Sequence, residues 1–195
     1  GDHAKARAAV KAYQDWLQTP AAQIPSDRRE LADTRRQALA TVAFYDAYMD
    51  YLEAVGTVGG APDPTRFEPT VTKLRSFIVD HGTNGPTYVP DAWNMIARMQ
   101  AELGQIARAE ESYRTLRRMA PNSPLVAQLA TAIFKAHYDS VRALETESEA
   151  SAASGASASE LEAVAGRLLT ARRDAVASGL DYLENATEPQ YGVLY

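Results

Sequence analysis

Histidine has the widest range of possible chemistry among the residues of this chain, and the spacing of the histidines argues against a metal site. The sequence contains three of them, His3, His81 and His137, and it contains no cysteine. Helical metal sites typically use two histidines four residues apart, as in HExxH, and thiolate zinc sites need cysteine. Neither arrangement occurs. We therefore expect structural or surface roles for the histidines and no bound metal.

Nucleophilic, phosphate-binding and acid-base motifs are also incomplete. Residues 155–159 read GASAS, which lacks the last glycine of G-x-S-x-G, and residues 56–60 read GTVGG without the lysine of a phosphate loop. The acidic pair Glu145 and Glu147 lies in a polar tract without the apolar surroundings that shift a pKa. The sequence thus predicts a protein that is not an enzyme and holds no cofactor.

An aromatic cluster is the remaining candidate for ligand binding. Phe44, Tyr45, Tyr48 and Tyr51 lie within eight residues of one another. Tyrosine offers a large contact area for a small ligand or a peptide. The helical spacing favours packing against neighbouring helices, and a small-ligand sensor is the alternative.

Composition narrows the classes of partner. The 195 residues are 46% hydrophobic, with a formal net charge of −5, and the charge argues against binding a nucleic-acid backbone. No apolar run approaches the roughly 18 residues of a membrane span, so we expect no membrane insertion within this chain. Arginine outnumbers lysine sixteen to four and alanine is abundant, which indicates a GC-rich bacterial genome.

Amphipathic segments separated by glycine and proline predict an all-α protein of about seven helices. We expect the helices at residues 2–19, 27–55, 66–81, 91–103, 105–119, 124–144 and 159–184. The glycine- and proline-rich residues 56–65 and the serine, alanine and acidic tract 145–159 are predicted as flexible loops. A capping box formed by Ser159 and Glu162 is expected to restart the last helix. We expect residues 1–195 to form a single helical domain.

One part of the sequence, residues 90–123, resembles a tetratricopeptide repeat (TPR), a pair of helices with small residues at their crossing. The matching positions are Trp93, Ile96, Ala97, Gly104, Ala109, Tyr113 and Pro121. The resemblance implies a right-handed α-solenoid of antiparallel helix pairs. Because the chain opens at Gly1 with a segment similar to the second half of such a repeat, we expect it to be part of a longer protein.

Members of this family bind peptides or partner helices in a concave groove lined by the first helix of each repeat. The resemblance places five partner-binding residues in that groove: Asn94, Met95, Arg98, Glu102 and Gln128. Asn94 stands where the family's carboxylate clamp has lysine, and Arg98 stands where it has asparagine. The clamp is incomplete, so the sequence gives no support for recognition of a C-terminal carboxylate.

These observations predict an interaction scaffold that binds a partner protein or peptide. A regulatory or substrate-positioning segment of a larger enzyme is one alternative, and the small-ligand sensor is another. The compartment, cytoplasmic or extracytoplasmic, depends on the sequence upstream of Gly1.

Overall fold

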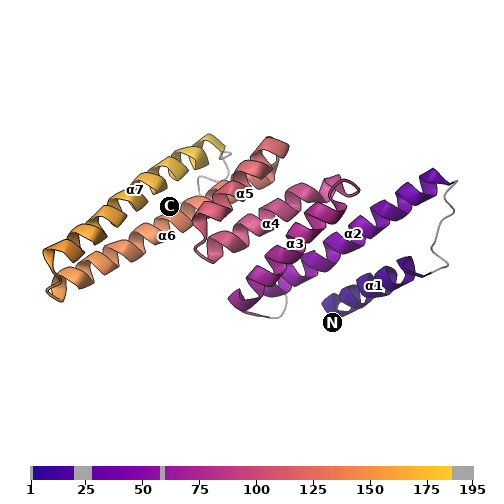
Figure 1. The fold of residues 1–195 in the computed structure, drawn as a ribbon, viewed down its shortest axis with the longest axis horizontal. Coiled ribbons are helices and arrows are strands. Elements are labelled where there is room, and N and C mark those ends of the chain that lie inside the picture. The colour runs from indigo at the N-terminus through magenta and orange to yellow at the C-terminus, as the bar shows by residue number, and fades with distance from the viewer. Residues whose placement is uncertain (1, 20–27, 58–59, 186–195) are drawn as a thin grey trace. The chain divides into compact units, whose positions relative to one another are not determined.

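The structure is a computed structural model that describes residues 2–19, 28–57 and 60–185. These residues form seven α-helices and no β-strand, which confirms the predicted all-helical class (Figure 1). The predicted beginning of the second helix, before residue 28, lies outside the described residues, as does Gly1. None of the described helices is both long enough and apolar enough to cross a membrane.

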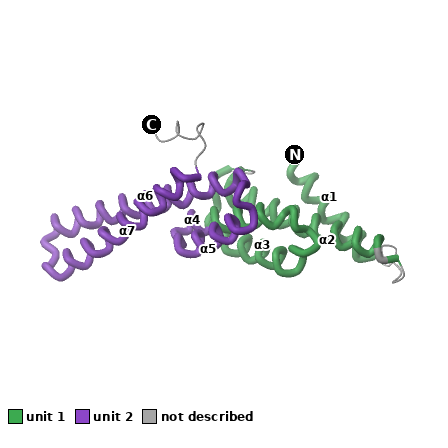
Figure 2. Tube along the Cα trace, turned by 90° about the horizontal axis from the view of Figure 1, so that it is seen from above, with its two compact units in different colours: residues 1–99 green, residues 100–195 purple. Residues whose placement is uncertain are grey.

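The chain divides into two compact units, Gly1–Met99 and Gln100–Tyr195, which are coloured separately in Figure 2. The boundary falls near the end of α4 (Val89–Glu102), so this helix contributes residues to both units.

The first unit is built on α2 (Arg29–Ala54), which packs against both α1 (Asp2–Leu17) and α3 (Phe67–His81). Two short 3₁₀ turns, η2 (Pro64–Arg66) and η3 (Pro86–Tyr88), lead into α3 and α4. The predicted helix at 66–81 is confirmed. Residues 56–65 contain no α-helix within their described part, and η2 begins at their end.

The aromatic cluster predicted on α2 forms packed contacts within the first unit. The Phe44 ring stacks on Tyr88 at a centroid distance of 4.6 Å and lies 5.5 Å from Phe77. Tyr48 stacks on the same Phe44 ring at 6.0 Å. Such pairs stabilise a core beyond the area they bury. The rings therefore join α2 to α3 and to the turn before α4.

Charged side chains add a second connection between the helices of the first unit. Asp50 on α2 accepts from Lys73 on α3 at 2.5 Å and from Arg7 on α1 at 2.7 Å. Lys73 also pairs with Asp46 at 2.7 Å, and Arg7 pairs with Glu53 at 2.9 Å. Burial alone raises the pKa of Asp50, but the hydrogen bonds and positive charges of Lys73 and Arg7 outweigh burial and hold that pKa below its ordinary value.

The second unit consists of the end of α4 followed by α5 (Ile106–Met119), α6 (Pro124–Ala153) and α7 (Ala158–Asn185). Gly104 has φ +70°, a conformation that glycine adopts easily, in the turn between α4 and α5. The side chain of Ser123 accepts from the backbone N–H of Leu125 and caps α6. The bounds of α4 and α5 agree with the predicted helices 91–103 and 105–119.

The prediction of a loop at 145–159 was wrong for residues 145–153, which continue α6. Alanine and glutamate are strong helix formers, and the neighbouring helix supplies charge partners. Glu147 pairs with Arg167 at 2.6 Å, and Glu145 pairs with Arg172 at 2.9 Å. These pairs join the end of α6, which is rich in serine, alanine and glutamate, to α7.

The predicted capping box also lies two residues too late. It is Ser157 and Glu160 that exchange hydrogen bonds at the beginning of α7. The backbone N–H of Ser157 donates to the Glu160 carboxylate at 2.8 Å, and the Ser157 hydroxyl accepts from the backbone N–H of Glu160. The turn between α6 and α7 is therefore only four residues long.

Candidate functional site

Helices α6 and α7 form an antiparallel hairpin in the second unit (Figure 1). Phe134 on α6 stacks on Tyr182 near the end of α7 at a centroid distance of 5.8 Å. At the other end of the hairpin, Glu147 on α6 pairs with Arg167 on α7. Val164 and Tyr182 are buried. One face of α7 is therefore covered by the rest of its own unit.

A second apolar face of α7 lies open to solvent. Its members are four large side chains, which we call the α7 stripe: Leu169, Val176, Leu180 and Leu183. Their exposed fractions are 54%, 64%, 60% and 49%, in that order. The spacings of seven, four and three residues place them along one side of the helix. Exposed apolar side chains gathered on one side of a helix mark surfaces that bind other molecules.

A shallow groove of about 380 Å³ runs beside the α7 stripe. Phe134, Tyr138 and Val141 of α6 line one side. Arg172, Ala175, Val176 and Gly179 of α7 line the other. Because Val176 belongs to both the groove and the α7 stripe, the two features form one continuous apolar surface. Grooves of this kind accept the apolar face of an amphipathic helix.

Arginine side chains lie beside this surface. Arg172 donates to Glu145 at 2.9 Å, and Arg142 lies 3.7 Å from the same carboxylate. The exposed Arg173 forms no hydrogen bond or ion pair in the part of the chain that the structure describes. Glu145 thus pairs with two arginines, and Arg173 is unpaired within the described residues.

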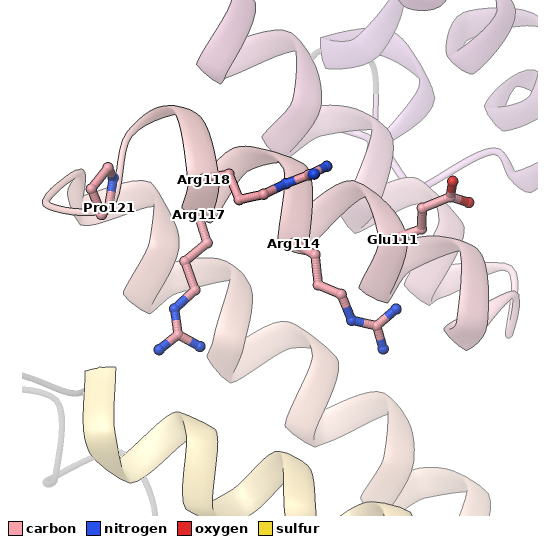
Figure 3. A pocket seen from close by; sticks show the side chains of 5 residues that line it. All are labelled: Glu111, Arg114, Arg117, Arg118 and Pro121. Carbon is pink, nitrogen blue, oxygen red and sulfur yellow. The ribbon is translucent and has the colours of Figure 1, made fainter.

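A second hollow, of about 580 Å³, lies on α5 and is lined by Glu111, Arg114, Arg117, Arg118 and Pro121. Three arginines suggest an anion site, but their side chains do not converge. In Figure 3, Arg114 and Arg117 extend from one side of α5, whereas Arg118 points away from them. Arg114 is already paired with Glu110 at 2.8 Å and Arg117 with Asp181 at 2.5 Å. This hollow lacks the arrangement of an anion site.

The five residues that the TPR resemblance places in a groove are divided between the two units. Asn94, Met95 and Arg98 belong to the first unit, and Glu102 and Gln128 belong to the second. Asn94 is 7% exposed and Met95 is 4% exposed, whereas the other three are exposed. The Oδ1 atom of Asn94 is buried without a hydrogen-bond partner among the described residues. Partner binding by these five residues stays a prediction.

The histidines make contacts of a structural kind. His137 is buried, and its Nε2 lies 2.9 Å from Glu110, which joins α6 to α5. The ring of His81 stacks near Phe77 at the end of α3, and His3 lies 3.6 Å from Glu53. Within the described ranges, histidine and acidic side chains form no cluster suited to a metal ion.

The α7 stripe was not predicted from the sequence, although the sequence contains a signal for it. Pairs of adjacent apolar residues recur every seven positions in this helix: Leu168 with Leu169, Ala175 with Val176, and Tyr182 with Leu183. The first member of each pair is less exposed than the second. A helix with two neighbouring apolar faces packs against two partners, and the hairpin supplies only one of them.

Comparisons with protein-family models, with curated proteins and with solved structures gave no match.

Proposed function

We propose that this chain is a non-enzymatic interaction module that binds a partner protein or peptide through the α7 stripe and the adjoining groove. The observation that carries the proposal is the exposure of Leu169, Val176, Leu180 and Leu183 on a helix whose other apolar face is already covered. The predicted contacts Glu102 and Gln128 of the second unit and Arg98 of the first unit are exposed as well, and partner binding by each stays a separate prediction.

The apolar area is large enough to contribute to binding. Each side chain of the α7 stripe is about half exposed. Full burial of a leucine or valine side chain stabilises by about 1.5–3 kcal/mol, so covering half of each contributes about 1 kcal/mol per side chain. The stripe then supplies roughly 4 kcal/mol before the entropic cost of association is subtracted. Further contacts along the groove add to this free energy of binding, and a total of this size suits a reversible, specific complex.

We further propose a right-handed α-solenoid of TPR-like repeats in a bacterial protein. The proposal is supported by the match of residues 90–123 to the repeat pattern and by the succession of α4 and α5 along the chain, with Gly104 between them. Solenoids of this kind expose long helical surfaces, which suits a scaffold.

Quantitative affinity capture tests the proposed binding surface. The bait is the full chain, compared with a double variant carrying Val176→Asp and Leu180→Asp. The control is Arg118→Glu, an exposed position on α5 outside the stripe and the groove, and it makes the net charge more negative by the same amount as the double variant. Because all three positions are exposed, the far-ultraviolet circular dichroism of the variants should match that of the original chain. We expect specific partners to be lost from the double variant and retained by the control. Identical sets of captured proteins would contradict the proposal.

A further inference from the structure

The α7 stripe has the spacing of a coiled-coil seam once Arg173 is included. Positions 169, 173, 176, 180 and 183 follow one another at intervals of four, three, four and three residues. This is the a/d repeat by which one helix packs into the holes of another. Four of the five seam positions are leucine or valine, and the fifth is the exposed Arg173.

An arginine inside a seam restricts which helix is able to cover it. Burying a charge without a partner is strongly unfavourable, whereas an opposing carboxylate forms a short, charge-assisted bidentate pair. Arg173 has no partner among the residues that the structure describes, and the nearby Glu145 is shared by Arg172 and Arg142. None of the described residues supplies this carboxylate, which favours a covering helix that carries one.

A second copy of α7 does not meet this requirement. In a parallel pair each seam residue faces its own copy, so Arg173 would lie opposite another Arg173. In an antiparallel pair that matches Val176 with Leu180, Arg173 would lie opposite Leu183. Neither orientation places an acidic residue in the seam opposite the guanidinium.

We infer that the α7 stripe binds an amphipathic helix of another protein, with apolar residues in heptad register and an aspartate or glutamate at the position facing Arg173. This inference rests on the proposed function and deepens it by assigning the chemistry of the partner. Arg173 sets the register and orientation of the complex, as single polar seam residues do in coiled coils. The apolar positions supply most of the buried area.

A charge-swap experiment with two synthetic peptides tests the inference. Each peptide is a helix of about three heptads with leucine at the seam positions, and one central seam position is glutamate in the first peptide and lysine in the second. Binding to the full chain is measured by fluorescence anisotropy with labelled peptide at nanomolar concentration. The protein variants are Arg173→Glu, Leu180→Asp and the control Arg118→Glu, which changes an exposed arginine of α5 outside the stripe.

We expect the original chain to bind the glutamate peptide at least about tenfold more tightly than the lysine peptide, because like charges facing each other in an interface are strongly unfavourable. Arg173→Glu should invert this preference, Arg118→Glu should leave it unchanged, and Leu180→Asp should weaken the binding of both peptides. The inference is overturned if neither peptide binds or if Arg173→Glu does not invert the preference. It is also overturned if sedimentation shows a dimer that Leu180→Asp dissociates, since a second copy would then cover the stripe. A third result combines loss of partners from the Val176→Asp and Leu180→Asp double variant with failure of Arg173→Glu to invert the peptide preference. That combination would support the proposed function and overturn only the inference about Arg173.

Discussion

Replacing Asp50 with asparagine tests whether the charged connection between α1, α2 and α3 stabilises the first unit. The carboxylate accepts from Lys73 at 2.5 Å and from Arg7 at 2.7 Å. The Lys73 and Arg7 side chains are 35% and 34% exposed, so solvent weakens both interactions. Each cation also keeps a second carboxylate, Asp46 or Glu53. The change therefore removes both ion pairs, keeps one oxygen acceptor at position 50, and leaves each cation with its second carboxylate.

Hydrogen bonds to charged groups contribute about 1.5–3 kcal/mol when buried, and exposed ion pairs contribute about 0.2–1 kcal/mol. For these half-buried pairs we expect Asp50→Asn to lower the free energy of unfolding by about 1–2 kcal/mol at pH 7. The pKa of Asp50 is lower in the folded chain than its ordinary value of 3.8. Its contribution is therefore complete above the ordinary value and is lost as the pH falls through the folded pKa.

The assay is urea unfolding of the full chain and of the variant at several pH values between 7 and 3, monitored by circular dichroism. The difference between the two proteins should be largest at neutral pH and should shrink toward the acidic end. Asp33→Asn is the matched control, since Asp33 pairs with Arg36 on α2 and both side chains are more than half exposed. It should change the free energy of unfolding by less than about 0.5 kcal/mol. Equal stability of Asp50→Asn and the original chain at pH 7 would refute the reasoning, as would a difference independent of pH.

Two further predictions concern the second unit. Gly166→Ala should stabilise α7 by about 0.5–1 kcal/mol, because alanine is the better helix former and no atom lies within 4 Å of the added methyl group. Gly179→Ala should stabilise α7 by less, since its methyl group would lie 3.1 Å from the Phe134 ring. Equal increases in the thermal unfolding temperature of the two variants would contradict the packing of α6 on α7. Tyr113→Phe should lower the free energy of unfolding by about 1.5 kcal/mol, because the buried phenol donates to Asp181 at 2.6 Å. Burial and this hydrogen bond raise the pKa of Tyr113, so the stability contributed by its hydroxyl group should persist up to about pH 10 and decline above it. Urea unfolding at pH 7 and at pH 10.5 measures the loss of unfolding free energy in Tyr113→Phe. The same loss at both pH values would contradict a stabilising hydrogen bond from the neutral hydroxyl group.

Local patterns were sufficient to predict most of the helices. The apolar stripe from Phe67 to Ile78 and the repeat-like segment containing Gly104 each carry their own signals for helix and turn. The continuation of α6 through residues 145–153 was not predictable in the same way. Its stabilising partners, Arg167 and Arg172, are on α7 and become neighbours only when the hairpin forms.

The candidate site depended on the structure even more strongly. The sequence shows that Leu169 and Val176 are apolar, but exposure depends on which face of α7 contacts α6, and the packing of Phe134 on Tyr182 determines that face. The predicted residues Asn94 and Met95 illustrate the opposite case. Their positions in the repeat pattern suggested a surface, yet both side chains are buried.

Site-specific photo-crosslinking in cells tests the central claim most directly. A photoreactive amino acid replaces Val176 in one experiment and Asp174 in the other, so that two exposed positions on different sides of α7 are compared in the same protein. We predict that the group at position 176 crosslinks to a helical segment of a specific partner protein, and that the group at position 174 does so weakly or not at all. Crosslinking of equal yield and identity at both positions, or no protein adduct at position 176, would contradict a binding function for the α7 stripe.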